Sequence, residues 1–206
     1  CDLALSYHKK EEKLICHYCR FSRPSLEECP RCGSRLIAKR GPGIEAVAEE
    51  LKKTFPQSRI EVLAVDEAAR KKERESMLGD FATGQVDILI GTQLLVHQAN
   101  LPPVSLVGIL HPETILHLAD FRSSQKAFQS ISKALAFLSA DAAAEAVIQT
   151  SNPEHFSIRE AARGDYSAFY AQEIRLRRLM DYPPFSCLAE VVFQGDNLRR
   201  LAEKAR

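Results

Sequence analysis

The spacing of the cysteines constrains the fold of this chain more than any other feature of its sequence. Five of the six cysteines lie within the first 32 residues, and four of them form two C-x-x-C pairs, Cys16 with Cys19 and Cys29 with Cys32. A C-x-x-C turn brings two sulfur atoms to one side of a tight loop, where they can share a tetrahedral zinc ion. Gly33 follows the second pair and permits the positive φ angle that such turns use. The pattern predicts a small module built around bound zinc.

Zinc is favoured over disulfide bonds because the sequence shows no secretory signal pattern. The alternative of a disulfide or free thiols stays open. A closed set of thiolates leaves zinc no position for a substrate, so we expect a structural rather than a catalytic site. His8 and His17 are alternative ligands, although both are more simply surface residues. Cys187 stands apart from the others, and we expect it to be a small buried hydrophobic residue.

The composition is that of a folded soluble protein. Hydrophobic residues make up 45% of the 206 residues, which is enough chain for one or two domains. No apolar run approaches the roughly 18–20 residues that a membrane helix needs. We therefore expect a cytoplasmic protein without a membrane partner. The first residue is Cys1 rather than Met, which we take to indicate a piece of a longer protein.

Charge is distributed unevenly along the chain. The first 40 residues hold nine Lys/Arg against five Asp/Glu, whereas residues 41–150 hold ten against fourteen. A basic module of this kind is compatible with contact to nucleic acid, and a merely solvated surface is the alternative. The candidate DNA-contacting residues are Lys9, Lys10, Lys13, Arg20, Arg23, Arg31 and Arg35, with Tyr7, Tyr18 and Phe21 as possible stacking partners. Packing of these aromatics against the zinc turns is an equally open interpretation.

The breaker cluster Arg40-Gly41-Pro42-Gly43 ends the cysteine module. Helices are predicted at Glu45–Phe55, Glu67–Phe81 and Arg122–Leu138, and strands at Arg59–Val65, Val86–Ile90, Val104–Leu110 and Glu145–Thr150. Helices that alternate with nearly continuous apolar strands indicate a parallel sheet covered on both faces. We therefore predict three regions: a zinc module at 1–40, a three-layer α/β domain at 41–150, and a helical connector at 151–206.

The last region is predicted to be helical from Ile158 to Met180, with an interruption near Gly164. The prolines of Tyr182-Pro-Pro-Phe185 stop this helix, and a strand and a helix follow. We interpret these last elements as the start of a C-terminal α+β domain.

No catalytic motif is present. The chain lacks a P-loop, a dinucleotide-binding G-x-G-x-x-G loop, an H-E-x-x-H zinc motif and a G-x-S-x-G nucleophile turn. Its carboxylates, such as Glu49, Glu50, Asp87 and Glu113, are scattered rather than paired. The residues alone therefore predict no catalytic residue and no self-contained active site.

A series of short motifs occurs in a specific order along nearly the whole chain. They are Cys16-His-Tyr-Cys19, Cys29-Pro-x-Cys32-Gly33, Gly41-x-Gly-x-Glu45, Asp87-Ile-Leu-Ile-Gly-Thr-Gln93, Val104-x-Leu-Val-Gly108, Asp120-Phe-Arg122, Phe128-Gln129, Gln149-Thr150, Pro153-Glu-His155 and Tyr182-Pro-Pro-Phe185. This series resembles the primosomal protein N′ (PriA) family of bacterial replication-restart DNA helicases.

The resemblance implies a superfamily 2 helicase that moves 3′ to 5′ with ATP and Mg²⁺, recognises forked or single-stranded DNA, and recruits other primosome proteins and single-stranded DNA-binding protein. Residues 41–150 would be its second RecA-like lobe, and the Walker motifs would precede Cys1. The family holds two zinc ions through eight cysteines. Cys1, Cys16 and Cys19 resemble three ligands of one site, and Cys29 and Cys32 resemble half of the other. Pairing of the two local C-x-x-C turns around one zinc remains the alternative.

Two stretches depart from the family pattern. The family's Ala-Lys-Gly-x-Asp-Phe-Pro is replaced by Val96–Pro102, and its Gln-Val-Ala-Gly-Arg-Ala-Gly-Arg by Lys133–Ala140. Both arginines of the last helicase motif are thus replaced, by Phe137 and Ala140. Arginines of this kind are worth about 10³–10⁵ in rate in other NTPases, and neither replacement can donate a hydrogen bond. Smaller departures are Glu113 for aspartate and Ile44 for threonine.

Three functional hypotheses follow. The first is a homologue with degenerate helicase motifs, retained for binding forked or branched DNA and for primosome assembly. The second is an active ATP-dependent helicase in which other residues replace the arginines. The third, independent of the resemblance, is a zinc-ribbon nucleic-acid-binding module. We do not expect this chain alone to hydrolyse ATP, and we expect Arg122 to form a salt bridge rather than to approach nucleotide.

Overall fold

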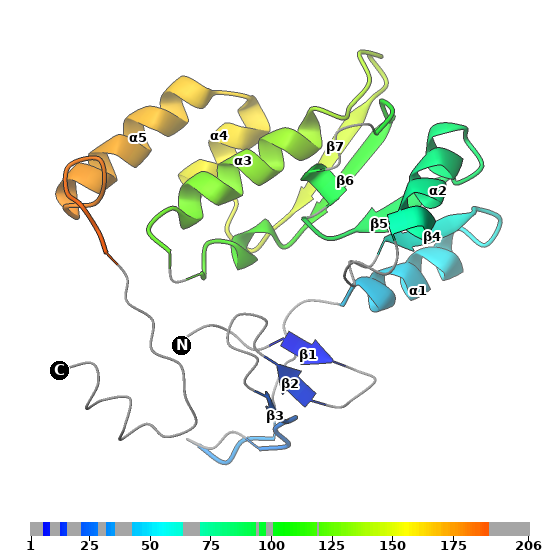
Figure 1. Ribbon diagram of the computed structural model, residues 1–206, viewed down its shortest axis with the longest axis horizontal. Coiled ribbons are helices and arrows are strands. Elements are labelled where there is room, and N and C mark those ends of the chain that lie inside the picture. Colours follow the sequence, from blue (N-terminus) through cyan, green and yellow to red (C-terminus); the bar gives the residue numbers. More distant parts are fainter. Residues whose placement is uncertain are drawn as a thin grey trace. The chain divides into compact units, whose positions relative to one another are not determined.

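The computed structural model describes residues 6–8, 13–15, 22–28, 32–35, 43–63, 71–93, 95–97, 101–118 and 120–189. It has a mixed α/β architecture and divides into two units, Cys1–Phe169 and Tyr170–Arg206. In chain order (Figure 1) the elements are β1 (Ser6–His8), β2 (Lys13–Ile15), β3 (Ser22–Pro24), α1 (Ile44–Thr54), β4 (Ile60–Leu63), α2 (Lys71–Ala82), β5 (Ile88–Gly91), the 3-10 turn η1 (Leu95–His97), β6 (Leu106–Leu110), the 3-10 turn η2 (Pro112–Thr114), α3 (Ser123–Leu135), β7 (Glu145–Gln149), α4 (Phe156–Arg163) and α5 (Tyr166–Leu179). Among the described helices, none is long and apolar enough to cross a membrane.

The first three strands form an antiparallel sheet in the order β1-β2-β3. Ile15 at the end of β2 pairs with Ser22 at the start of β3, so residues 16–21 connect two neighbouring strand ends. Cys16 and Cys19 belong to this connection and lie outside the described residues. The C-x-x-C spacing of this connection is one that structural zinc sites use.

The strands β4 and β5 form a parallel pair that is associated with α1 and α2. Ile60 pairs with Ile88, and Leu63 pairs with Gly91. Ile60 and Leu63 are buried, as is Ala48 on α1. Two apolar positions of a short strand therefore anchor this part of the fold, as the β-branched run at 59–65 predicts.

The strands β6 and β7 form a second parallel pair, with Leu106 opposite Glu145 and Leu110 opposite Gln149. Side chains alternate between the two faces of a strand. Ile109 and Ile148 are on the face that packs against the hydrophobic core. Leu106, Leu110 and Val147 are on the other face, where they are 60%, 44% and 55% exposed.

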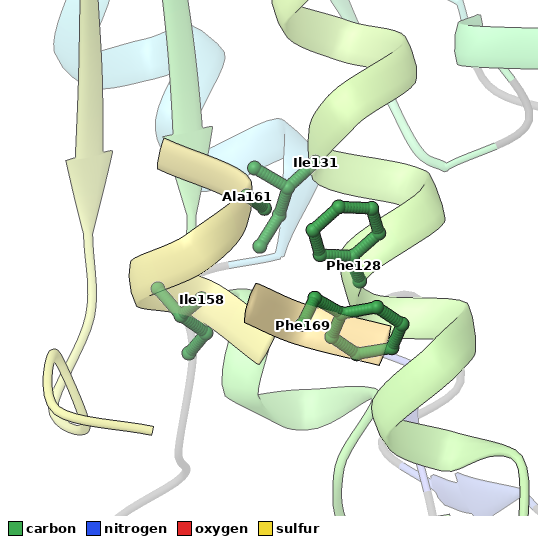
Figure 2. Packing of buried hydrophobic residues seen from close by; sticks show 5 residues of the cluster. All are labelled: Phe128, Ile131, Ile158, Ala161 and Phe169. Carbon is green, nitrogen blue, oxygen red and sulfur yellow. The ribbon is translucent and has the colours of Figure 1, made fainter. Parts of the chain in front are cut away.

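The core lies where α3, α4 and the first turn of α5 meet (Figure 2). It consists of the buried residues Phe128, Ile131, Ile158, Ala161 and Phe169. The rings of Phe128 and Phe169 stack with centroids 4.1 Å apart and an interplanar angle of 17°. Burial of one such ring stabilises the fold by about 1.5–3 kcal/mol. The contact therefore packs the first turn of α5 against α3.

The expected interruption of the C-terminal helical region at Gly164 is confirmed. Gly164 has φ of 68°, in the left-handed region, and its N–H donates to the carbonyl of Ala161 at the end of α4. Glycine adopts this conformation without the strain that a Cβ would bring. At the other end of α4, the side chain of His155 accepts a hydrogen bond from the backbone N–H of Ser157 and caps the helix.

The alternation of helices with parallel strands is also confirmed, but the described strands form two separate pairs instead of one sheet. On the described residues, β6–β7 is covered on one face only. The helix expected at Arg122–Leu138 ends earlier, at Leu135. The residues that follow pair instead with the segment before β6: the N–H of Val104 donates to the carbonyl of Phe137, and Val104 bridges to Leu138.

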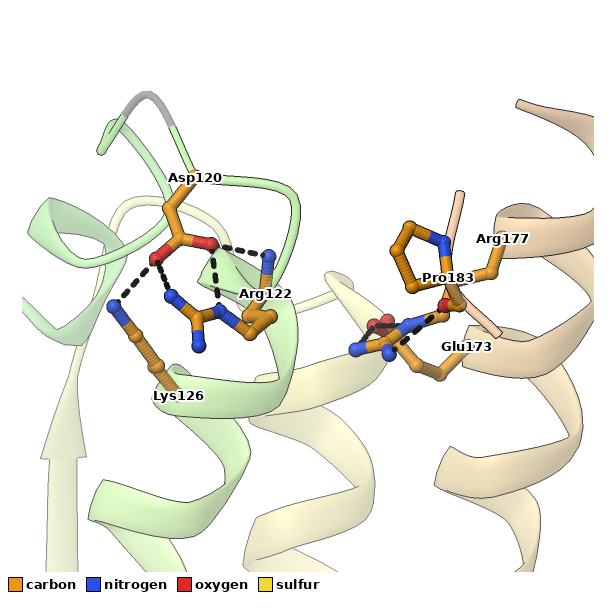
Figure 3. A network of polar contacts seen from close by, with 6 residues as sticks. All are labelled: Asp120, Arg122, Lys126, Glu173, Arg177 and Pro183. Carbon is orange, nitrogen blue, oxygen red and sulfur yellow. Dashed lines mark hydrogen bonds and ion pairs between the residues drawn. The ribbon is translucent and has the colours of Figure 1, made fainter. Parts of the chain in front are cut away.

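In the unit Tyr170–Arg206, the chain turns after α5 and bonds back to it. Arg177 donates to Glu173 Oε1 at 2.8 Å and to the carbonyl of Pro183 at 3.3 Å (Figure 3). The guanidinium of Arg178 lies 4.7 Å from the centroid of the Phe185 ring. The Tyr182–Phe185 turn is thus fixed to the last turns of the helix, which explains why the helix stops there.

One prediction for this unit was wrong. Cys187 is exposed rather than buried. It lies in an irregular stretch after the Tyr182–Phe185 turn, so neither a helix nor a strand turns its side chain towards the interior. The strand and helix expected after Phe185 lie mostly in residues 190–206, outside the described part.

Candidate functional site

The predicted zinc ligands lie almost entirely outside the described residues. This holds for Cys1, Cys16, Cys19 and Cys29. Cys32 is described and exposed, and Gly33 beside it has φ of 67°, as expected for the turn after a C-x-x-C pair. Within the described ranges no three His, Cys, Asp or Glu side chains are grouped as metal ligands. What is described nevertheless fits a zinc module: an accessible thiol before a left-handed glycine, and a small antiparallel sheet.

Two of the described basic residues that were predicted to contact DNA lie on opposite faces of this sheet. Of the basic residues, Lys13, Arg23 and Arg35 are described, and all three are exposed. Lys13 pairs with Pro24 and Arg23 pairs with Leu14, so strand alternation directs the side chains of Lys13 and Arg23 to opposite faces. Arg35 is engaged with Glu28, with Nε 2.8 Å from Oε1. The prediction that Lys9, Lys10, Arg20, Arg31, Tyr18 and Phe21 contact DNA concerns residues outside the described part.

The most strongly built polar cluster lies at the carboxyl ends of β6 and β7. Glu113, in the turn η2 after β6, is only 8% exposed. Its Oε2 accepts from Thr150 Oγ1 at 2.7 Å, and its Oε1 accepts from Ser151 Oγ at 2.7 Å and Ser151 N at 3.1 Å. Because Thr150 and Ser151 follow β7, this carboxylate clamps the two strand ends together.

Electrostatics define what Glu113 can do. Burial alone would raise the pKa of its carboxyl group, but the hydrogen bonds from Thr150 and Ser151 outweigh burial and lower the pKa to about 2. At neutral pH it is therefore a carboxylate that holds no proton to donate. We conclude that Glu113 is an anchor for the strand ends rather than a general acid.

His111 lies between β6 and η2, next to the carboxylate of Glu113. It adopts φ of 51° and ψ of 50°, a left-handed conformation that is uncommon outside glycine. Its N–H donates to the carbonyl of Gln149 at 2.9 Å, and its Nδ1 lies 3.5 Å from Glu113 Oε1. The neighbouring strand and the carboxylate together hold this strained backbone in place.

A second polar cluster precedes α3. Asp120 Oδ1 and Oδ2 each lie 3.1 Å from the Arg122 guanidinium, at Nε and Nη2, and Oδ2 is 2.5 Å from Lys126 Nζ (Figure 3). The hydrogen bonds from Arg122, together with the single hydrogen bond and the positive charge of Lys126, hold the pKa of the Asp120 carboxyl group well below its usual range despite partial burial. Arg122 thus forms the salt bridge that the sequence analysis expects.

Some of the residues at which the chain departs from the family pattern lie in the described part of the structure. Phe137 is half-buried in the turn after α3, and Ala140 is exposed two residues after Leu138, which bridges to Val104. Of the stretch Val96–Pro102, Val96 and His97 lie in η1, while residues 98–100 are outside the described part. Ile44 is the first residue of α1.

Steric crowding explains why position 91, in the motif Asp87-Ile-Leu-Ile-Gly-Thr-Gln93, is a glycine. A Cβ placed on Gly91 would lie 2.8 Å from Leu95 Cβ, so a larger residue would push η1 away from the end of β5. This motif is therefore locally required for the turn as well as part of the family resemblance.

Sequence reasoning missed three groups that the structure brings together. It treated Glu113 as a scattered carboxylate, and it singled out neither the Asp120–Lys126 pair nor the His155 cap. A signal was available for the first group: polar residues follow directly after two strands that were predicted to be parallel, and the carboxyl ends of parallel strands meet at one edge.

Comparison with known proteins identifies relatives along the whole chain. Residues 1–24 match the family described as the PriA DNA helicase Cys-rich region (CRR) domain. The chain is 37% identical over 206 residues to the replication restart protein PriA of Bacillus subtilis, covering 100% of this chain and 26% of that protein. It is 38% identical to the protein of the same name from Chlamydia pneumoniae and 33% identical to that of Borreliella burgdorferi, covering 28% and 31% of them. These matches confirm the resemblance, and the chain spans about a quarter to a third of the length of these relatives.

Proposed function

Because the chain is homologous from end to end to part of the PriA replication-restart proteins, we propose that the protein acts in replication restart, binding forked or single-stranded DNA and supporting primosome assembly. The observation that carries this proposal is the combination of a match along the whole chain with the family's Cys-rich region at residues 1–24. A zinc ribbon from an unrelated nucleic-acid-binding protein would not share the later 180 or so residues.

The zinc module would hold two ions in the intact protein. Cys1, Cys16 and Cys19 are proposed as ligands of one ion, and Cys29 and Cys32 as ligands of the other. The zinc would act as a structural cross-link, because a closed thiolate set leaves no position for substrate. Two zinc ions per full-length molecule, measured by atomic emission, would support this assignment, whereas one ion would favour pairing of the two local C-x-x-C turns.

We assign residues 41–150 to the second RecA-like lobe, residues 1–40 to the zinc module and residues 151–206 to a connector that leads into a C-terminal domain. Two parallel strand pairs with α1, α2 and α3 beside them support the lobe assignment. Parallel sheets are rarely stable as two-stranded pairs with an uncovered face. We therefore expect β4–β5 and β6–β7 to belong to one sheet in the intact protein.

The helicase motor is proposed to be degenerate. Phe137 and Ala140 stand where the family has arginines, and neither can donate to a transferring phosphate. Loss of arginines of this type lowers turnover by about 10³–10⁵ in other NTPases.

The test is ATP hydrolysis by the full-length protein with and without forked DNA, alongside fork binding. Background turnover with tight fork binding supports a restart factor that marks forks and leaves unwinding to another enzyme. Robust turnover stimulated by DNA would instead support an active 3′-to-5′ helicase in which other residues replace the two arginines. Absence of fork binding would contradict the proposal as a whole.

A further inference from the structure

The exposed face of α3 is basic and contains no carboxylate. The helix includes Lys126 and Lys133 but no Asp or Glu, and Arg122 directly precedes it. Yet residues 41–150 as a whole hold ten Lys/Arg against fourteen Asp/Glu. This helix face therefore departs from the acidic character of the segment around it.

The basic residues are aligned along one side of the helix. Steps of four, seven and eleven residues return to nearly the same direction at 100° per residue. The exposed side chains that follow this spacing are Arg122, Lys126, Gln129 and Lys133, and the opposite side carries the buried Ala127, Phe128, Ile131 and Ala134. The basic face extends over about 16 Å, the length of eleven residues at 1.5 Å each.

Helix electrostatics do not account for these positions. The amino end of a helix carries partial positive charge, so cations are favoured near the carboxyl end and disfavoured near the amino end. Arg122 and Lys126 stand at the amino end of α3. Asp120 offsets their charge in part, but one carboxylate faces two cations, and the group keeps a net positive charge. A cation in excess at the amino end of a helix runs against the local electrostatic preference, and natural proteins show such departures at functional sites.

Asp120 also gives the two cations a fixed geometry. It bonds to the Arg122 guanidinium through both oxygens and to the ammonium of Lys126 through one (Figure 3). Long side chains that are already ordered lose less conformational entropy when they bind a partner. This cluster is thus prepared for contact with an anion.

The position of α3 agrees with such a role. Its carboxyl end lies at the start of β6, where Val104 bonds to Phe137 and Ser139. Its amino end therefore lies towards the carboxyl ends of β6 and β7. Ligands of open α/β sheets bind at that edge.

From these observations we propose that Arg122, Lys126 and Lys133 form a contact surface for the phosphate backbone of DNA. The inference rests on the proposed function, because it assumes that the intact protein binds DNA. Phosphate contacts from lysine and arginine carry no sequence information, so the surface would position DNA without selecting a sequence.

The test uses the full-length protein carrying both Lys126→Gln and Lys133→Gln. Binding to a fluorescent oligothymidine and to a hairpin duplex is measured over a range of salt concentrations. We expect the affinity for DNA at low salt to fall about tenfold. Because two phosphate contacts are lost, the magnitude of the slope of log K against log salt should decrease by about 1.4 for single strands or about 1.8 for duplex. The DNA form that shows the change identifies the one bound by this surface.

The matched control is Lys52→Gln with Lys53→Gln, two exposed lysines of α1, which changes the net charge equally. Circular dichroism and thermal unfolding establish that both variants fold. If the wild-type protein binds no DNA, the proposed function fails. If the wild-type protein binds DNA and the α3 variant has the same affinity and salt slope as the α1 control, the proposed function stands and the DNA contact by α3 is contradicted. The same holds if the α3 variant binds DNA normally but loses an acidic protein partner.

Discussion

The two parallel strand pairs are each tied at one end by a single carboxylate, but the two ties differ in burial. At the amino ends of β4 and β5, Asp87 Oδ1 lies 2.9 Å from Arg59 Nη2, with side chains 42% and 56% exposed. At the carboxyl ends of β6 and β7, Glu113 is buried and accepts from Thr150 and Ser151. A carboxylate therefore connects both strand pairs, but it is exposed to solvent in β4–β5 and buried in β6–β7.

The comparison shows that a similar pKa does not mean a similar contribution to stability. Hydrogen bonds from Arg59 lower the pKa of Asp87 to about 2, and hydrogen bonds from Thr150 and Ser151, working against burial, lower that of Glu113 to about 2. Water and salt screen the exposed pair, so its loss is partly compensated by solvent. Loss of Glu113 would remove a buried carboxylate that accepts three hydrogen bonds, so solvent would replace its contacts less completely than those of the exposed pair. The Glu113 contacts should thus contribute more to the free energy of unfolding than the Asp87–Arg59 pair does.

The largest expected effect is that of Glu113→Ala. Removal of this buried carboxylate takes away the acceptor of two hydroxyl groups and one backbone N–H, so the free energy of unfolding should fall by about 3 kcal/mol. Urea denaturation at pH 7 measures the change. The control is Glu145→Ala, an exposed glutamate on the same strand pair. Equal losses in both variants would show that burial of Glu113 does not matter.

The pH dependence of stability provides the second test. The pKa of Glu113 is lowered from 4.5 to about 2, so its contribution is complete above pH 4.5 and is lost as the pH falls towards 2. The full loss corresponds to about 3 kcal/mol. Urea midpoints between pH 6 and 2 should therefore fall less steeply for Glu113→Gln than for the unchanged chain. Parallel curves would contradict the assigned pKa.

The cap of α4 should have a smaller effect in the same region. His155 Nδ1 accepts from Ser157 N, which requires a neutral imidazole, and burial lowers the pKa of His155 below 6.5. His155→Ala should cost about 1 kcal/mol at pH 8. As the pH falls below 6.5, the unfolded chain takes up a proton before the folded one does, so the difference between the two chains should shrink. A difference that stays constant from pH 8 to 5 would exclude the cap.

The smallest effect is expected from Asp87→Asn. The variant loses an exposed ion pair with Arg59, and the loss should be smaller than that of Glu113→Ala at low salt and close to zero at about 1 M salt, where the Debye length is about 3 Å. Urea denaturation at two salt concentrations measures it. A loss that is unaffected by salt would mean that the two ties are equivalent after all.

The elements of the fold could be predicted from the sequence where apolar spacing was regular. The helix at 45–55 and the strand at 145–150 agree with α1 and β7 to within one residue at each end. The break at Gly164 followed from the residue itself, since glycine favours the left-handed conformation that ends a helix. Local preferences were sufficient in these cases.

Predictions failed where an element depends on distant partners. The residues after the end of α3 at Leu135 pair with Val104, some thirty residues earlier, and no local pattern marks this pairing. The clamp of Glu113 joins residues 37 and 38 positions apart. The exposure of Cys187 depends on how the turn after α5 is fixed by Arg177 and Arg178. Such contacts belong to the tertiary structure and cannot be read from spacing.

The uncovered face of β6–β7 has a consequence for the behaviour of this chain in concentrated solution. Leu106, Leu110 and Val147 form an apolar strip on a sheet whose other face is packed. Apolar surface of this kind favours association between copies of the chain as its concentration rises. Since Val147 points away from the core, a charged residue there would improve solubility at little cost to packing.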